Sequence, residues 1–333
     1  KIPALDPCSQ QEAKDLAELA LELSERYQIP VILRPTMRVC HSRQQVSCGP
    51  VKAEYKKAYF EKNPRRWAAT QGDRLKLHHL LNQKLAAIEK EFETWEANKI
   101  ILPEGSKEKT LPLGIVACGV SYAYLCDLLE PLGLTDKVGV LKIATAYPLP
   151  RVMVADFASR CSRLLVLEEP DIAVETQIRI NKPVWGRLTG HVPPQGELTP
   201  EVTEWILTRA ASEAGLLATG RNLEPIRNAV ASLDLSVRRP TLCPGCVHRT
   251  SFYAMRRSYP DAIFPGDIGC YTLGLNLGAV DTCHDMGASI TMASGFNHAY
   301  AQDGNKPPIL AKIGEGTFFH SGAAGLENAV FNG

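Results

Sequence analysis

The chain has 333 residues, of which 45% are hydrophobic and 22% are charged, and its formal net charge is +1. This composition is typical of a globular protein with two or three domains. A net charge this small, without a block of basic residues, disfavours nucleic acid and membrane surfaces as partners. No apolar run approaches the roughly 20 residues that a helix needs to span a bilayer.

The ten cysteines suggest a reducing compartment. Six of them are scattered, some in apolar runs where they are expected to be small core residues. The other four, which cluster late in the chain, are Cys243, Cys246, Cys270 and Cys283. A disulfide framework is unusual in a chain of this length, so we expect a cytoplasmic protein in which only the late cluster carries chemistry.

The first 112 residues predict two helices and one strand. Ser9 and Glu12 form a capping box, and helical spacing then continues to Tyr27. Residues 31–33 predict a short buried strand, with no strand expected before the helix. Residues 51–112 read as a charged connector, in which an apolar stripe from residue 77 to residue 95 predicts a packed helix.

From residue 113 the pattern alternates between strand and helix. Apolar strand patterns at 113–119, 138–150 and 163–170 are separated by helical patterns at 120–134 and 151–161. Such alternation predicts a parallel sheet with right-handed crossovers. Because the glycine after the first strand lacks the further glycines of a dinucleotide fingerprint, we expect a structural domain of Rossmann type.

Glycines punctuate the last part of the chain where strands are predicted to end. The stretch "AIFPGDIGCYTLG" predicts a strand that runs into a glycine-punctuated loop, and a helix with small residues in its first turns follows. "PPILAKIGEG" predicts a second buried strand that ends in Glu315 between two glycines. We expect the two loops to meet at one edge, where bare backbone can approach a diphosphate and a carboxylate can hold its magnesium.

The stretch "TLCPGCVHR" places Cys243 and Cys246 on a Pro-Gly turn, called the knuckle below. Two thiols spaced in this way suit a metal clamp, a redox pair or a turn that shapes a cofactor pocket. His248 and Arg249 behind the turn could hold a carboxylate or a phosphate.

These stretches resemble a known family. "LCPGCVHR", "FPGDIGCYTLG", "MGASI" and "GEGTFFHSGAAGLENAVFN" resemble the thiamine-diphosphate domain of the alpha subunits of indolepyruvate:ferredoxin oxidoreductases, members of the 2-oxoacid:ferredoxin oxidoreductase family. "QEAKDLAELALELSERYQIPVILRPTMRVCHS" is similar to the end of the pyrimidine-binding domain of that family. The resemblance implies an α/β fold with parallel-sheet domains, in a fragment of a longer subunit that lacks both ends.

The implied domains follow the chain. They are the tail of the pyrimidine-binding domain (1–50), the helical connector (51–112), a Rossmann-type domain like the transketolase C-terminal domain (113–212), a linker (213–240) and a truncated diphosphate-binding domain (241–333).

The resemblance also implies an activity. The complete enzyme would oxidatively decarboxylate aryl pyruvates such as indolepyruvate to acyl-CoA and pass the electrons to ferredoxin. It would need thiamine diphosphate, Mg²⁺ and a [4Fe–4S] cluster, together with coenzyme A, a second (beta) subunit and an oligomeric assembly. Two alternatives stay open: a non-catalytic metal-binding or assembly subunit of the same fold, and a thiamine-dependent decarboxylase without an electron acceptor. The fragment by itself is expected to be inactive and to bind the cofactor weakly.

The resemblance assigns roles to individual residues. Catalytic roles fall to His320 and Ser321, and the metal ligand is Glu315, where the family has a shorter acid. The cluster would be held by Cys243, Cys246 and Cys270 or by a missing C-terminal domain; zinc or a plain turn are the alternatives for the knuckle. Substrate contacts are assigned to Arg38, His41 and Arg249. The remaining cofactor contacts are Gly266, Asp267, Gly269, Cys270, Gly287, Ala288, Gly314, Gly316, Thr317, Cys243, Cys246 and His248.

Overall fold

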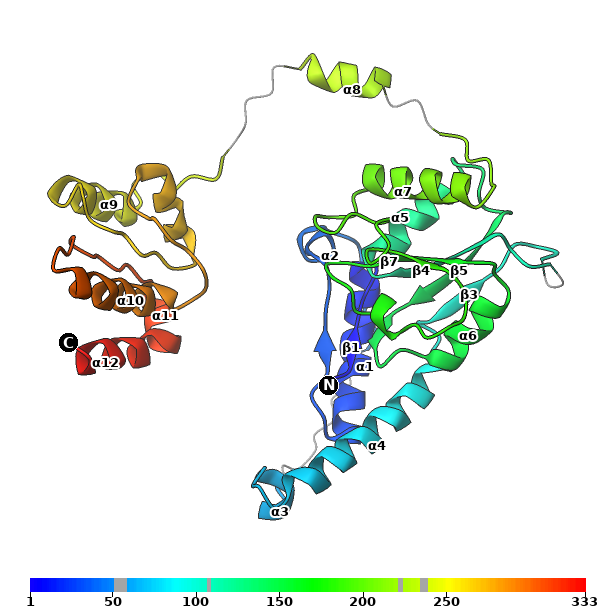
Figure 1. The fold of residues 1–333 in the computed structure, drawn as a ribbon, viewed down its shortest axis with the longest axis horizontal. Coiled ribbons are helices and arrows are strands. Elements are labelled where there is room, and N and C mark those ends of the chain that lie inside the picture. The colour runs from blue at the N-terminus through cyan, green and yellow to red at the C-terminus, as the bar shows by residue number, and fades with distance from the viewer. Residues whose placement is uncertain (51–58, 107–108, 221–223, 234–238) are drawn as a thin grey trace. The chain divides into compact units, whose positions relative to one another are not determined.

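The computed structural model describes residues 1–50, 59–106, 109–220, 224–233 and 239–333. These residues form two units, Lys1–Ile226 and Arg227–Gly333 (Figure 1). No helix among the described residues has the length and apolar character that a membrane crossing requires. All ten cysteines lie in the described ranges and are free thiols.

A five-stranded sheet forms the centre of the first unit. Its strand order is β3 (Lys99–Ile101), β5 (Val138–Ile143), β4 (Leu113–Cys118), β7 (Leu164–Leu167) and β8 (Val184–Trp185). The pairs β4–β5, β4–β7 and β7–β8 are parallel, whereas β3 is an antiparallel edge strand. The predicted parallel α/β sheet is therefore confirmed. The edge strand β3 lies in the segment that was expected to be a helical connector, because its three residues are too few to show a strand pattern.

Helices cover both faces of this sheet, as Figure 1 shows. Helices α5 (Val120–Leu129) and α7 (Pro200–Glu213) share an apolar cluster with one face, and α6 (Arg151–Ser159) shares a second cluster with the other face. Strands β4 and β5 are buried at every residue, so their uninterrupted apolar runs are explained by burial on both faces.

The N-terminal segment forms a small second sheet in the same unit. Strand β1 (Ala4–Leu5) pairs in parallel with β2 (Ile32–Leu33) and antiparallel with β6 (Thr145–Tyr147). Two expectations were wrong here. A strand does precede helix α1 (Gln10–Tyr27), and β2 is not buried, since Ile32 is 46% exposed at the edge of the small sheet.

The ends of α1 and the predicted connector helix agree closely with the sequence pattern. The backbone N–H of Glu12 donates to Ser9 Oγ at 3.2 Å, as a capping box requires. The carboxylate of Glu12, however, accepts from the N–H of Cys8 at 2.7 Å instead of from the cap residue. Helix α4 (Arg74–Phe92) is the predicted connector helix, and its last turns are buried against α1.

Short elements complete the first unit and the start of the second. They are α2 (Met37–His41), α3 (Pro64–Trp67), the 3₁₀ turn η1 (Glu175–Gln177) and α8 (Glu224–Ala231).

The second unit contains helices and three extended segments. The elements are α9 (Val247–Ser258), the 3₁₀ helix η2 (Cys270–Leu277), α10 (Ala288–Asp303), α11 (Glu315–Thr317), the π-helical turn η3 (Phe318–Gly322) and α12 (Ala323–Phe331). Parallel bridges join Ile263 to Ile309 and Pro265 to Thr282. The sheet character predicted here is present only as these bridges. The stretch after Gly269 is a 3₁₀ helix and not an open loop, and Ile309 is only half-buried.

Candidate functional site

Tyr271 lies at the centre of the predicted cofactor region in the second unit. Its side chain is 9% exposed, and its hydroxyl donates to the carbonyl oxygen of Ile268 at 2.7 Å. The same hydroxyl lies 3.2 Å from Thr317 Oγ1 and 3.4 Å from Asp267 Oδ2. The phenol therefore connects the segment after the first extended stretch with the turn that follows the last one.

Glycines surround the Tyr271 ring because other residues would collide with it. A Cβ built on Gly269 or on Gly314 would lie 2.5 Å from Tyr271 Cε1. Both strand ends therefore approach one ring, which confirms the prediction that the two glycine-containing loops meet. Gly266 is needed for a different contact, since its Cβ would lie 2.8 Å from the carbonyl oxygen of Thr282.

Asp267 fixes the beginning of helix α10. The residue is fully buried, and its Oδ1 accepts the N–H of Gly287 at 2.6 Å. Gly287 has φ +100, a conformation that favours glycine, and a Cβ there would lie 2.9 Å from Ser321 Oγ. Ala288 follows as the first residue of the helix. The buried carboxylate thus holds the helix start in place, while glycine keeps the surface around it bare.

The first turn of α10 has the properties of an anion site. The first N–H groups of a helix have no partner within it and carry the positive end of the helix dipole. Ser289 in this turn is fully buried, and its Oγ has no hydrogen-bond partner. A buried hydroxyl without a partner costs free energy, so this turn fits a ligand with acceptor oxygens, such as a diphosphate.

Lys312 adds a positive charge without a hydrogen-bond partner to the second unit, beside Phe252. Its Nζ is buried without a hydrogen-bond partner and lies 3.4 Å from the centroid of the Phe252 ring. Burial lowers the pKa of Lys312, and the thiols of Cys246 and Cys270 act in the opposite direction. A lysine in this environment favours a nearby anion, since pairing would recover part of the cost of burying its charge.

The knuckle forms as a turn that leads into helix α9. The N–H of Cys246 donates to the carbonyl oxygen of Cys243 at 3.1 Å, and Gly245 between them has φ +72. Cys246 Sγ lies 3.2 Å from Nδ1 of His248. The predicted convergence of both thiols with Cys270 on one cluster is not present: within the described ranges, no three His, Cys, Asp or Glu side chains are grouped to hold a metal ion.

The turn that carries Glu315 is mostly exposed. Glu315 is the first residue of α11, and a Cβ on Gly316 would meet nothing within 4 Å. His320 is exposed, whereas the Ser321 hydroxyl lies 3.4 Å from the carbonyl oxygen of Met286 beside the start of α10. Magnesium in phosphate sites is commonly held by one or two carboxylates, phosphate oxygens and waters, so a single exposed carboxylate here is compatible with it.

The residues predicted to contact substrate have other partners. Arg249 Nε donates to the carbonyl oxygen of Cys243 at 3.2 Å, so this guanidinium holds the knuckle turn. Arg38 in the first unit forms an ion pair with Glu197 at 2.7 Å. His41 is exposed at the end of α2.

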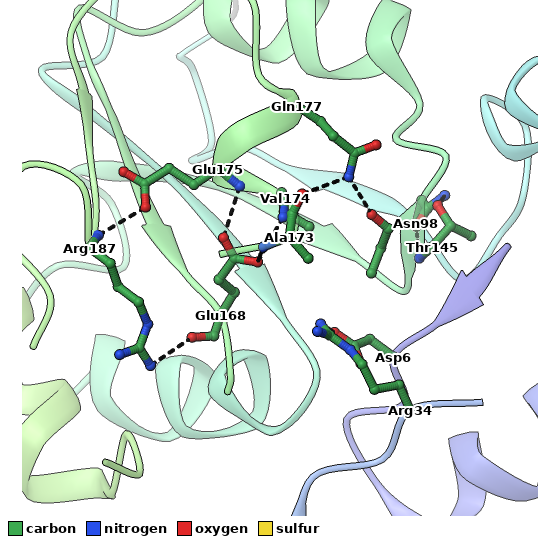
Figure 2. A network of polar contacts seen from close by, with 11 residues as sticks. Asp6, Arg34, Asn98, Thr145, Glu168, Ala173, Val174, Glu175, Gln177 and Arg187 are labelled. Atoms are coloured by element: carbon green, nitrogen blue, oxygen red, sulfur yellow. Dashed lines mark hydrogen bonds and ion pairs between the residues drawn. The ribbon is translucent and has the colours of Figure 1, made fainter. Parts of the chain in front are cut away.

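In the first unit, the carboxyl end of β7 carries a network of internal polar contacts (Figure 2). Glu168 is buried directly after this strand, and its carboxylate accepts three backbone N–H groups. The donors are Ala173, Val174 and Glu175, at 2.9, 2.7 and 2.8 Å. Open parallel sheets commonly bind ligands at this edge, but here the carboxylate orders the loop that follows the strand.

The N-terminal segment covers the neighbouring end of β4. A Cβ on Gly119, the residue after β4, would lie 3.7 Å from the carbonyl oxygen of Pro7. Beside it, Arg34 donates to both carboxylate oxygens of Asp6, at 3.0 and 2.6 Å. Burial raises the pKa of Asp6 above its usual range in spite of this pair. The chain itself therefore fills the place next to Gly119.

Two residues of the site, Tyr271 and Lys312, were missed at the sequence level, and Ser289 was recognised only as one of the small residues in the first turns of a helix. Lys312 gave a signal, because a lysine inside the apolar stretch "PPILAKIG" is unusual for a strand buried in a core. The unpartnered hydroxyl of Ser289 depends on its surroundings in space, so no sequence pattern could indicate it.

Comparisons with known proteins give a consistent result. No protein-family model matches the chain. The indolepyruvate oxidoreductase subunit IorA of Archaeoglobus fulgidus is 36% identical over 342 residues, which cover 100% of this chain and 52% of that protein. The IorA proteins of Methanothermobacter marburgensis and Pyrococcus abyssi are 37% and 38% identical, and in both cases the match covers 99% of this chain and 53% of the relative. The chain thus spans about half the length of these relatives.

Among solved structures, a 2-oxoglutarate:ferredoxin oxidoreductase from Magnetococcus marinus aligns with a TM-score of 0.42 and 15% sequence identity. This alignment covers 64% of the present chain and 42% of that one.

Proposed function

Because this chain is homologous over its whole length to indolepyruvate oxidoreductase subunit IorA, we propose that it forms part of the alpha subunit of a 2-oxoacid:ferredoxin oxidoreductase. The complete enzyme would oxidise aryl pyruvates such as indolepyruvate to acyl-CoA, with ferredoxin as electron acceptor and a beta subunit as partner. The ten free thiols of this chain agree with the proposal of a reducing cytoplasm.

One observation in the structure carries the assignment of a cofactor site. The start of α10, with the unpartnered Ser289 hydroxyl, belongs to the same unit as the unpaired Lys312 ammonium and the glycines that flank Tyr271. Thiamine diphosphate, when bound, would supply the electron sink for decarboxylation of a 2-oxo acid. Helix N-termini with bare backbone bind phosphate groups in many proteins. This site is therefore proposed to hold the diphosphate end of the cofactor.

Different residues of this chain would bind different parts of the cofactor. Ser289 and the free N–H groups of α10 would donate to the diphosphate, and Asp267 would keep the helix start in position. Glu315 would contribute its carboxylate to the magnesium ion. Ser321 lies beside the helix start and His320 lies in η3, the turn after the one that carries Glu315, so these two are proposed to contact the bound cofactor or substrate. An iron–sulfur cluster remains a proposal for the complete enzyme, and no step is assigned to it here.

Hydrogen exchange with mass spectrometry tests this placement. We expect thiamine diphosphate with Mg²⁺ to protect the backbone amides at 287–292 and 313–318, whereas thiamine without phosphates protects neither segment. Binding should be weak, with a dissociation constant of about 1 mM, because only the diphosphate end is held. Ser289→Ala should weaken binding by about tenfold, since a hydrogen bond to a charged group contributes roughly 1.5 to 3 kcal/mol.

A matched variant controls for nonspecific effects of the substitution. Ser251→Ala removes an exposed hydroxyl on α9 that donates to the carbonyl oxygen of Val247, and it should leave the protection unchanged. Absence of protection at about 10 mM cofactor, well above the expected dissociation constant, would refute the location of the site. Micromolar, stoichiometric binding would refute the view that this chain holds only one end of the cofactor.

A further inference from the structure

A cavity of about 500 Å³ lies on the outer side of helix α9 in the second unit. It is lined by Arg249, Tyr253, Arg256, Arg257 and Leu277. The first four share one face of α9, because their positions differ by four, seven and eight residues. Leu277 is the last residue of η2 and supplies the apolar wall opposite the helix. The lining thus combines three guanidinium groups with an aromatic ring and an aliphatic side chain.

The three guanidinium groups have N–H donors that form no hydrogen bond within the described part of the chain. Within the described part of the chain, none of them forms an ion pair with a carboxylate. Arg249 and Arg256 donate to backbone carbonyl oxygens, and Arg257 Nη1 lies 3.4 Å from the hydroxyl of Tyr253. A guanidinium has five N–H donors, so most of the donors that border the cavity are unused. Arginine forks match the oxygens of carboxylates and phosphates.

The structural role of these arginines accounts for only part of the arrangement. Arg256 and Arg257 stand in the last turn of α9, where positive charge offsets the negative end of the helix dipole. That role needs neither a hollow nor an apolar wall. Tyr253 is 64% exposed and Leu277 is 41% exposed, so two apolar surfaces face water beside three unpaired cations. A ligand with both an anionic and an apolar part would cover all of them.

We propose that this cavity binds a small organic anion that joins a carboxylate or phosphate head to a planar apolar body. The head would lie on the guanidinium groups of Arg256 and Arg257, and the body would lie between Tyr253 and Leu277. The volume falls within the range of roughly 300 to 1,000 Å³ that is usual for small-molecule sites.

This site is separate from the proposed thiamine site, and it does not depend on that function. The neighbouring face of α9 carries Phe252, which is fully buried between Gly274 and Lys312. Phe252 packs with Tyr271 in one apolar cluster, and none of the residues that line the cavity belongs to that cluster.

Isothermal titration of the full chain with three probes tests the proposal. Phenylacetate carries a carboxylate head, phenyl phosphate carries a phosphate head, and inorganic phosphate has no apolar body. We expect saturable binding of at least one aryl anion, about tenfold or more tighter than inorganic phosphate, because only the aryl probes cover Tyr253 and Leu277. The preferred head distinguishes an aromatic acid from a phosphorylated compound as the natural ligand.

Variants locate the binding. The double substitution Arg256→Gln and Arg257→Gln should lower the affinity for the more tightly bound aryl probe by about tenfold or more. Lys306→Gln removes an exposed positive charge elsewhere in the same unit and should leave affinity unchanged. Equal loss in both variants, or no saturable binding by the native chain, would overturn the proposal.

A measurement on the native chain covers the case in which the double variant does not fold. An arginine-directed dicarbonyl reagent should modify Arg256 and Arg257, and saturating phenyl phosphate or phenylacetate should protect both from it. Peptide mass spectrometry quantifies the modification at each arginine, and Arg151 in the first unit serves as the unprotected reference. Equal modification of Arg256 and Arg257 with and without the aryl probes would refute the site.

Discussion

The contact between Gly314 and the Tyr271 ring gives a direct test of the site geometry. In Gly314→Ala, the new Cβ would lie 2.5 Å from Cε1, 2.9 Å from Cζ and 2.8 Å from the hydroxyl oxygen of Tyr271. Carbon atoms pack best about 3.5 to 4.0 Å apart, so the ring must move by roughly 1 Å. The movement stretches the 2.7 Å bond to Ile268 and the 3.2 Å contact with Thr317.

The expected cost follows from two contributions. Overpacking of a filled site costs about 1 to 3 kcal/mol, and the loss of one hydroxyl bond adds about 1 kcal/mol. The backbone of Gly314, with φ −76 and ψ 151, suits alanine as well as glycine. Alanine therefore recovers about 0.4 to 1 kcal/mol through the unfolded state. We expect a net loss of about 1 to 3 kcal/mol in the stability of the second unit.

Gly316→Ala is the matched control. It makes the same chemical change two residues later, where a Cβ meets nothing within 4 Å. Because this position is helical, alanine should be neutral or stabilise by about 0.5 to 1 kcal/mol. Native-state hydrogen exchange resolved to peptides at 263–317 measures the local opening free energy of both variants.

Tryptophan fluorescence supplies an internal reference in the same samples. All four tryptophans, Trp67, Trp95, Trp185 and Trp205, belong to the first unit. Their urea transition should therefore not change in Gly314→Ala. If Gly314→Ala and Gly316→Ala have equal opening free energies at 263–317, the two strand ends do not enclose the Tyr271 ring and the site is wrongly built.

Two further outcomes follow from single polar groups. Tyr271→Phe removes the hydroxyl contacts and should lower the opening free energy at 263–317 by about 1 to 2 kcal/mol. Tyr259→Phe, at an exposed position, is the control. Equal opening free energies in the two variants would contradict the role of the Tyr271 hydroxyl. For Asp6, burial raises the folded-state pKa above the ordinary value of 3.8 although Arg34 opposes it. The folded state then keeps this proton longer than the unfolded state does, so its contribution to stability is lost as pH rises from about 4 through the raised pKa. Urea unfolding of the native chain and of Asp6→Asn at stepped pH should show this loss only in the native chain, and parallel pH profiles would contradict it.

The parallel sheet was predictable because its strands are buried on both faces. Runs such as Leu113–Cys118 are apolar at nearly every position, and the helices between them keep a clear period. Short edge elements gave no such signal. Strands β1 and β3 contain two and three residues, and their pairing depends on partners that are far away in the sequence.

In the candidate site, too, the features set by local sequence could be predicted, whereas those set by contacts between distant residues could not. Glycines at strand ends were recognised because their pattern is local, and the convergence of Gly269 with Gly314 followed from sheet topology. The Tyr271 ring that fills the space between them could not be predicted, since its place depends on the conformation of η2. Among the described residues no three His, Cys, Asp or Glu side chains are grouped to hold a metal ion, so a cluster shared by the knuckle and Cys270 stays a proposal for the complete enzyme.

The two units differ in the hydrogen-bond partners of the polar groups that are buried near their strand ends. In the first unit, the buried charges are paired: Glu168 accepts three N–H groups, and Arg34 binds Asp6 in two places. Among its described residues, the hydroxyls of Thr36 and Ser121 and the Nε atoms of Arg160, Arg163 and Arg187 are buried without partners. Other nitrogens of each of these arginines donate hydrogen bonds, and a neutral hydroxyl is much cheaper to bury than an ion.

In the second unit, the Nζ atom of Lys312 and the hydroxyl of Ser289 are both buried without a hydrogen-bond partner, one cationic and one neutral. A protein keeps such groups when something else compensates their cost, and an anion bound at the start of α10 would accept from the Ser289 hydroxyl. Sequence resemblance and unpaired polar groups are independent observations, and both favour this edge. The binding chemistry of the described residues is therefore expected in the second unit, while the strand ends of the first unit serve to hold its two sheets together.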